Sequence, residues 1–247
     1  MMLPVLRCPL CSKILERRAE KAVCSYCDEV DEPQEGAPLP WRCPDGHFIC
    51  ETCRSSEPER LWPRLVATAK SLDPYAIANL AMAHPSMRQT PYGPDHHGIP
   101  AIALLVALRN AGVFTGTDQR ILAAARRGRA MPSGACYLEG GCGACIGAGA
   151  AVSTVLKLGL KSTGRSWALR AVSLSLGALA ETGGLRCCKE AVYEAIGGAL
   201  AVLGSMMPAA ASMQRERVVC SFASDMPECK RSACPHYPGD SAAMRPE

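Results

Sequence analysis

Apolar residues recur at helical intervals along most of the chain after residue 58. Leu, Ala and Val return on one face of seven segments, and this period predicts helices. The segments are Glu59 to Ser71, Pro74 to Ala83, Ile99 to Ala111, Thr117 to Arg127, Cys145 to Leu158, Ser166 to Ala180 and Cys187 to Leu203. Gly-rich or Pro-containing turns such as PYGPDHHG and KSTGRS separate them. No stretch here shows the period of two that a strand requires, so we expect an all-α core.

Small residues should let these helices pack closely. Aromatic residues make up only 5% of the chain, and Ala and Gly lie on many helix faces. One stretch, Ala195 to Gln214, has no charged residue, but its Gly, Ser and Pro208 keep the hydropathy low. A membrane span needs about 20 strongly apolar residues, so we expect a buried helix in a soluble core instead.

Fifteen cysteines among 247 residues form three clusters, and these define the expected organisation. Residues 1–57 are predicted to form a small Cys/His zinc-binding module, residues 58–215 the helical core, and residues 216–247 a Cys-containing tail. No charged segment followed by an apolar one opens the chain, so we expect no secretory signal and a cytoplasmic location. In a reducing cytoplasm, clustered cysteines hold metal or do chemistry instead of forming disulfides.

The first cluster has the spacing of paired metal ligands. Two CxxC pairs precede the run CPDGHFICETC, giving eight ligands: Cys8, Cys11, Cys24, Cys27, Cys43, His47, Cys50 and Cys53. Eight such ligands suit two tetrahedral zinc ions in closed, structural sites. Zinc binding would also supply the folding energy that about fifty residues with little apolar content lack. We predict a ribbon-like or treble-clef-like module with two zinc ions.

The run RCPDGHFICETCR resembles the central knuckle of RING-type ubiquitin ligase domains. A RING domain has a further Cys pair after this run, whereas here both CxxC pairs come before it. The spacing allows the pairs to join either sequentially or in a crossed order.

The second cluster places cysteines where Gly-rich loops become helices. Its members are Cys136, Cys142, Cys145, Cys187 and Cys188. Glycines let the backbone approach an inorganic group, and the start of a helix favours an anion. An iron–sulfur cluster, of the 4Fe-4S class, is such a group. The alternative is that these are small buried residues of a tightly packed core.

The segment CYLEGGCGACIGAGAAVS resembles the cluster-binding segment in the alpha domain of iron–sulfur L-serine dehydratases, and L-cysteine desulfidases share the same general plan. GGLRCCKEAVYEAI and TPYGPDHHGIPAIALLVAL resemble later and earlier segments of that family. The resemblance implies that Cys136 and Cys145 bind a cluster. As a whole, the chain resembles an uncharacterised family of Cys-rich prokaryotic proteins of unknown function.

A cluster with three protein ligands leaves one iron open as a Lewis acid, which suits β-elimination or sulfide transfer. The candidate bases are His96 and His97 in a Gly/Pro loop, with a solvated turn as the alternative. Glu139 is a further candidate base, or a partner for the backbone of its loop.

The third cluster lies in the tail and consists of Cys220, Cys229 and Cys234. Its spacing is loose for a zinc knuckle. These thiols either form a site with His236 or fold back to complete the cluster of the core.

Two functions follow from these patterns. The first is an iron–sulfur enzyme, a lyase or a sulfur transferase, that acts on a small amino acid or thiol. The second is a non-catalytic metal-binding adaptor or cluster carrier that docks through Trp41 and the zinc module onto a partner enzyme; a homo-oligomer also fits. The net charge of +4 is spread along the chain and favours neither nucleic acid nor membrane as a partner.

Overall fold

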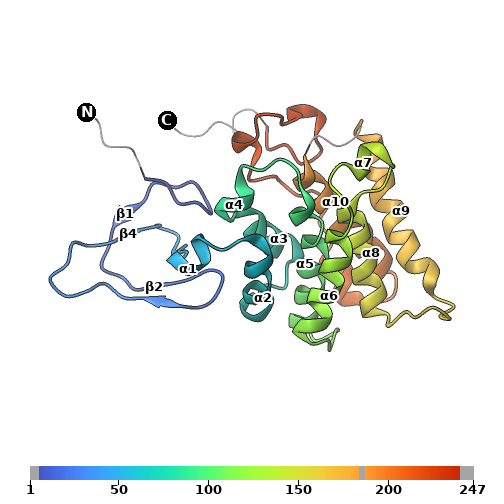
Figure 1. Cartoon of the computed structure of the whole chain (residues 1–247), viewed down its shortest axis with the longest axis horizontal. Coiled ribbons are helices and arrows are strands. Elements are labelled where there is room, and N and C mark those ends of the chain that lie inside the picture. Colours follow the sequence, from blue (N-terminus) through green and yellow to red (C-terminus); the bar gives the residue numbers. More distant parts are fainter. Residues whose placement is uncertain (1–5, 184–186, 240–247) are drawn as a thin grey trace.

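The fold is mainly helical, as the periodicity of the core predicted (Figure 1). A computed structural model describes residues 6–183 and 187–239. The module with its cysteine groups lies at one end, the helices form the body, and the Cys-containing tail follows them. The predicted fold class is therefore confirmed.

The N-terminal module contains very little regular structure. Strand β1 (Glu16–Arg17) pairs antiparallel with β4 (Trp41–Arg42), and β2 (Ala22–Val23) pairs antiparallel with β3 (Val30–Asp31). One short helix, α1 (Glu51–Arg54), closes the module. Two-residue ladders cannot enclose an apolar core, so the fold of this segment depends on other links.

The main helices lie close to their predicted positions. They are α2 (Pro58–Thr68), α3 (Pro74–Ala83), α5 (Ile99–Asn110), α6 (Asp118–Arg129), α8 (Gly143–Val155), α9 (Arg165–Glu181) and α10 (Cys188–Gly204). Side-chain caps fix where α3 and α6 begin. The side chain of Asp73 accepts a hydrogen bond from the N–H of Tyr75, and that of Thr117 accepts one from the N–H of Arg120. Helix α8 begins two residues earlier than predicted, because Cys142 takes the N-cap position.

Short elements connect these helices. They are α4 (Pro85–Arg88), η1 (Pro94–His96), α7 (Ala135–Leu138), α11 (Pro208–Ser212), η2 (Ala223–Asp225) and η3 (Arg231–Ala233). The uncharged stretch from Ala195 is divided between α10 and α11. No helix in the described ranges has the length and apolarity needed to span a bilayer.

Helix α10 is the centre of the body and contacts α3, α5, α8, α9 and α11. Glycines bring neighbouring helices close together: a Cβ on Gly128 of α6 would lie 2.9 Å from the Cα of Gly147 in α8. Likewise, a Cβ on Gly149 of α8 would lie 2.6 Å from Val172 of α9. These helices therefore pack closely, as their small residues led us to expect.

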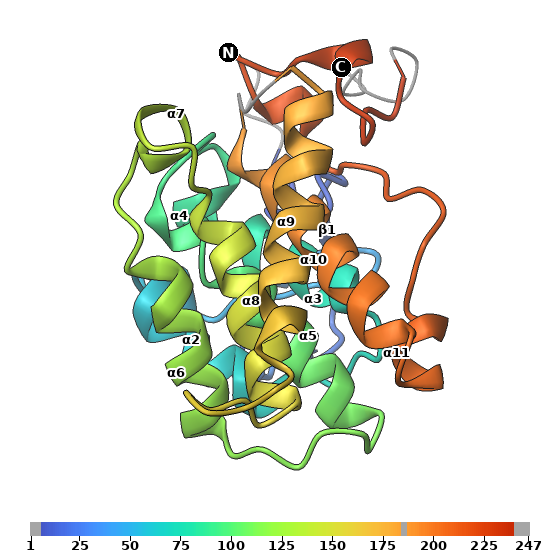
Figure 2. The same cartoon turned by 90° about the vertical axis from the view of Figure 1, so that its right-hand side faces the viewer.

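The tail after α11 runs back along the helices to the end where α10 begins (Figure 2). There it contributes Phe222 and Met226 to the same buried apolar cluster that contains Tyr26 and Ile49 of the module. The division of the chain at residues 57 and 215 stays a prediction, because packing is continuous across both positions.

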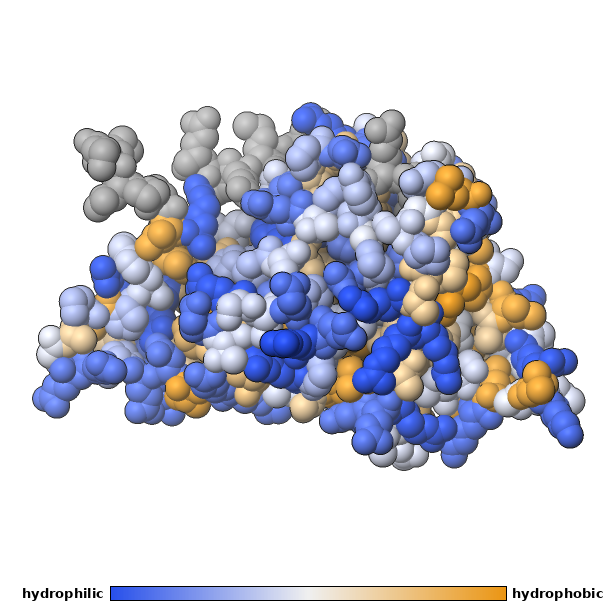
Figure 3. Space-filling model, viewed as in Figure 1, coloured by the Kyte–Doolittle hydropathy of each residue, from blue (hydrophilic) through white to orange (hydrophobic). Residues whose placement is uncertain are grey.

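Helix α9 forms the opposite edge of the molecule from the module. Around it, Leu160, Leu169 and Leu174 are exposed, and this edge is the most apolar part of the face in Figure 3.

Candidate metal centres

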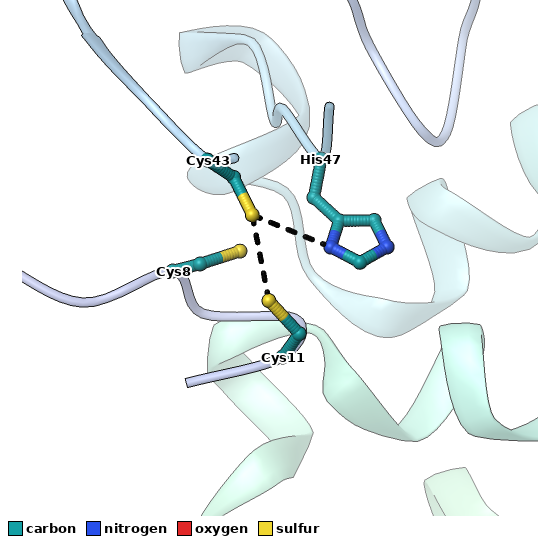
Figure 4. Close-up of side chains that lie close together, drawn as sticks. All are labelled: Cys8, Cys11, Cys43 and His47. Atoms are coloured by element: carbon teal, nitrogen blue, oxygen red, sulfur yellow. Dashed lines mark hydrogen bonds between the residues drawn. The ribbon is translucent and has the colours of Figure 1, made fainter. Parts of the chain in front are cut away.

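The first group of ligands joins the first and third pairs of the module. Cys8 and Cys11 come from the turn before β1, and Cys43 and His47 follow β4 (Figure 4). The Sγ atoms of Cys11 and Cys43 are 3.4 Å apart, and Cys43 Sγ is 3.6 Å from Nδ1 of His47. Four thiolates or imidazoles at about 2.3 Å or less from one zinc ion have such separations. This set can hold one metal ion.

The second group joins the second and fourth pairs. Cys24, Cys27, Cys50 and Cys53 are its members. The Sγ atoms of Cys27 and Cys50 are 3.6 Å apart, and in each group all four ligand atoms lie within 4.8 Å of one another. Cys50 caps α1, and its sulfur accepts the N–H of Cys53 at 3.4 Å. The pairing order is therefore crossed, which settles the alternative that the spacing left open.

Burial raises the pKa of two thiols in each group, Cys8 and Cys11 in the first and Cys50 and Cys53 in the second, and so favours their protonated form. It raises the pKa of Cys11 to about 12 and that of Cys53 to about 11. Metal binding must therefore displace protons, so affinity falls as the pH falls. One sulfur also receives a hydrogen bond from a cation of the core: Nη1 of Arg64 in α2 donates to Sγ of Cys53 at 3.0 Å.

The module is fastened to the helices by hydrogen bonds next to its ligands. Nη1 and Nη2 of Arg88 in α4 donate to the carbonyl of Leu10 at 3.3 Å and to Oγ of Ser12 at 2.7 Å. Nε2 of His84 donates to the carbonyl of Cys53 at 2.8 Å, and the hydroxyl of Tyr26 donates to the carbonyl of Leu80 at 2.8 Å. Three of the four ligand pairs are thus tied to the body.

The tail cysteines meet one cysteine of the core around a cavity of about 30 Å³. Cys220, Cys229 and Cys234 line it together with Cys187, the N-cap of α10. Burial, followed by charge on the other three thiols, raises the pKa of Cys220 to about 11. His236 also lines the cavity, but Nδ1 contacts the carbonyl of Val218 and Nε2 contacts Glu194.

The remaining core cysteines lie apart from that cavity. Cys136 is in α7, Cys142 and Cys145 start α8, and Cys188 is the first residue of α10. A hydrogen bond from Cys145, with backbone N–H groups, lowers the pKa of Cys142 to about 7. Within the described ranges, these thiols form no group as tight as those of the module. Whether they bind a cluster stays a prediction.

Comparison with known families now adds to this geometry. A model of a family of unknown function, DUF5714, matches residues 63–237. The chain belongs to the DUF5714 family. No curated protein and no solved structure matches it.

The DUF5714 match separates the cysteines into two sets. All eight ligands of the module precede residue 63, whereas the core cysteines and the tail cysteines lie inside the matched range. The thiols around α10 are therefore part of the matched DUF5714 region, and the module precedes it in the chain.

The candidate bases of the DUF5714 region do not line the cysteine cavity. His96 is 1% exposed, and among the described residues neither ring nitrogen has a hydrogen-bond partner. Nδ1 of His97 donates to the carbonyl of Met131 at 3.2 Å. Glu139 is exposed at the end of α7. None of the three lines the cavity around Cys220.

Two buried cations close to the cysteines were missed by sequence reasoning. Lys189 is fully buried beside Cys187 and Cys188, and Arg88 is 8% exposed between module and tail. The only signal for Lys189 was a basic residue directly after two cysteines, and nothing near Arg88 in the sequence indicated its role.

Proposed function

We propose that the chain is a zinc-dependent adaptor, in which a metal-folded module fixed on the DUF5714 domain presents its outer surface to a partner enzyme. The observation that carries this proposal is the pair of complete ligand sets, one with three Cys and one His and the other with four Cys. Such donor sets favour zinc, and with four protein ligands each ion has no position open for chemistry.

The outer side of the module supports a docking role. Trp41 is 44% exposed, and Val23 and Val30 on the second ladder are 45% and 50% exposed. Apolar side chains of this size on so small a unit suit a contact surface, in which aromatic residues contribute strongly.

The proposal predicts about two zinc ions per chain. Cys11→Ser removes a ligand from the first site and Cys27→Ser from the second, so each variant should lose at least one zinc. Metal analysis of the purified chain by mass spectrometry measures this. Cys136→Ser is the matched control, because that thiol lies outside both groups, and it should keep both ions.

Retention of both ions by Cys11→Ser and Cys27→Ser would refute the assigned ligand sets. The adaptor role has its own readout: Trp41→Ala should keep its zinc and lose binding to the enzyme that the native chain captures. Equal capture by both proteins would remove Trp41 from the contact.

An iron–sulfur lyase or sulfur transferase is the second candidate. It is favoured by Cys142, whose pKa of about 7 makes it a partial thiolate at neutral pH, next to Cys145 at the start of a helix. The likeness of this segment to L-serine dehydratases and L-cysteine desulfidases belongs to the same proposal. Release of sulfide from L-cysteine or pyruvate from L-serine, lost in Cys142→Ser, would favour the enzyme; inactivity of the iron-loaded chain would favour the adaptor.

A further inference from the structure

Four cysteines from separate segments converge on one side of the start of α10. Cys187 is the N-cap of that helix, Cys220 precedes η2, and Cys229 and Cys234 flank η3. They line a common cavity, and Cys188, the neighbour of Cys187, does not. The convergence depends on the tail folding back, where the N–H of Cys220 donates to the carbonyl of His236 at 2.8 Å.

Two of these sulfurs accept the N–H of the residue two positions later. Phe222 donates to Cys220 at 3.3 Å and Arg231 donates to Cys229 at 3.4 Å. The backbone N–H groups of Lys189 and His236 act in the same sense on Cys187 and Cys234, where they lower the pKa of each thiol against the raising effect of burial.

The same local arrangement occurs at the ligands of the module. The backbone N–H groups of Leu10, Lys13 and Tyr26 likewise lower the pKa of the cysteines two positions before them, Cys8, Cys11 and Cys24. Backbone N–H groups aimed at sulfur stabilise thiolates, which are the metal-binding form. The four cysteines around α10 therefore share this local backbone environment with the candidate ligands of the module.

The charge around the cavity also favours an anion. Glu190 and Lys230 in the lining pair with each other at 2.7 Å, which leaves the charge of Lys189 in excess among the lysines and carboxylates that line the cavity. Lys189 is fully buried, and its Nζ donates to the carbonyls of Met87 at 3.0 Å and Thr90 at 2.7 Å, with the ring of Phe222 at 5.4 Å. Among the described residues, no carboxylate contacts this ammonium. A buried ammonium without a counter-charge is costly, and a group held by four thiolates would supply that charge.

The spacing of the four sulfurs favours a cluster over a single ion. Both groups of the module have all ligand atoms within 4.8 Å, whereas the cavity cysteines do not form such a group. The cavity of about 30 Å³ holds about two water molecules, and the hollow including its open mouth measures about 400 Å³. A core of several irons and sulfides separates its cysteine ligands more widely than one zinc ion does.

We infer that Cys187, Cys220, Cys229 and Cys234 bind an iron–sulfur cluster through four thiolates. Assembly from two ferric ions and two sulfide ions forms four iron–thiolate bonds, releases four thiol protons to solvent and transfers no electrons. A four-iron core needs two ferric and two ferrous ions with four sulfides, and the thiol reductant added in the reconstitution supplies the two electrons that reduce two of the ferric ions. Because all four protein ligands are cysteines, no iron is left open for a substrate. This centre is suited to electron transfer or to structural support of the tail, and it is independent of the zinc proposal.

The test uses the full chain, purified without oxygen and reconstituted with iron and sulfide under a thiol reductant. We expect iron and acid-labile sulfide in equal amounts, about two or four of each per chain, with visible absorption that dithionite bleaches. Cys229→Ala and Cys234→Ala should each lose at least fivefold of the iron and sulfide. Cys136→Ala is the matched control and should keep both.

The two zinc ions of the module report on folding in every variant. A variant that keeps its zinc and loses iron supports the assignment, because misfolding would remove both. A native chain with a third zinc and no iron would overturn the cluster. Iron that is kept in Cys229→Ala and lost in Cys136→Ala would place the cluster at the start of α8 instead. Addition of L-cysteine or L-serine should leave the absorption spectrum of the four-cysteine cluster unchanged, because none of its irons is open to a substrate.

Discussion

At the scale of single residues, the burial of His96 has the clearest effect on how stability depends on pH. Burial lowers its pKa to about 3, and neither ring nitrogen has a partner among the described residues. The unfolded chain binds a proton on this histidine below about pH 6.5, whereas the folded chain does not. Since the unfolded state then binds more protons, stability is lost as the pH falls from 6.5 toward 3, by at most about 1.4 kcal/mol per unit.

His96→Leu should remove this contribution. We expect the variant to match the native chain at pH 7.5 and to exceed its free energy of unfolding by about 1 kcal/mol at pH 5.5. Urea unfolding at several pH values, with zinc in excess, provides the comparison. Parallel pH profiles for the two proteins would contradict the buried neutral state.

Among the sequence features, residue spacing was the best guide to the candidate metal ligands of the module. CxxC turns aim two thiolates at one ion by local geometry alone, so Cys8 and Cys11, for example, could be paired from sequence. The crossed order and the meeting of Cys187 with the tail depend on contacts between distant segments, for which no local rule exists. The buried positions of Arg88 and Lys189 could not be predicted for the same reason.

At the scale of elements, the contact between α6 and α8 depends on two glycines. A Cβ on Gly147 would lie 2.4 Å from the carbonyl oxygen of His97, which is backbone and cannot rotate away. Gly147→Ala should therefore destabilise the chain by about 1–3 kcal/mol. Gly177→Ala in α9 is the matched control, because nothing lies within 4 Å of its Cβ, and it should stabilise by about 0.5–1 kcal/mol.

Thermal or urea unfolding of both glycine variants measures the difference. Equal changes in the two proteins would mean that helix propensity, and not close approach, determines the effect at Gly147.

The helices themselves were predictable because their apolar period extends over several turns. Pro74 to Ala83 matches α3 at both ends, since Asp73 and Pro74 mark its start. Helices α1, α4, α7 and α11 have four or five residues, too few for a period to be recognised. Their positions follow from the packing around them.

At the scale of the whole molecule, Arg88 joins module, body and tail. Besides its bonds to Leu10 and Ser12, it forms an ion pair with Asp225 of η2 at 2.8 Å, and both side chains are largely buried. Arg88→Met removes one partner of a buried pair and should cost about 3–5 kcal/mol of unfolding free energy. Lys13→Met is the control, because its pair with Asp45 is exposed and should contribute less than about 1 kcal/mol.

Urea unfolding of both variants, with zinc saturating, tests this prediction. If Arg88→Met costs no more than Lys13→Met, the module and the tail are not coupled through this residue.

The crossed ligand order also determines how the module would respond to a broken backbone. The exposed residues 34–39 lie between the second and third ligand pairs. A protease cut there would leave Cys8, Cys11, Cys24 and Cys27 on one fragment and the other four ligands on the second. Each ion would then be shared equally by both fragments, so the severed pieces would stay bound to each other through both metals.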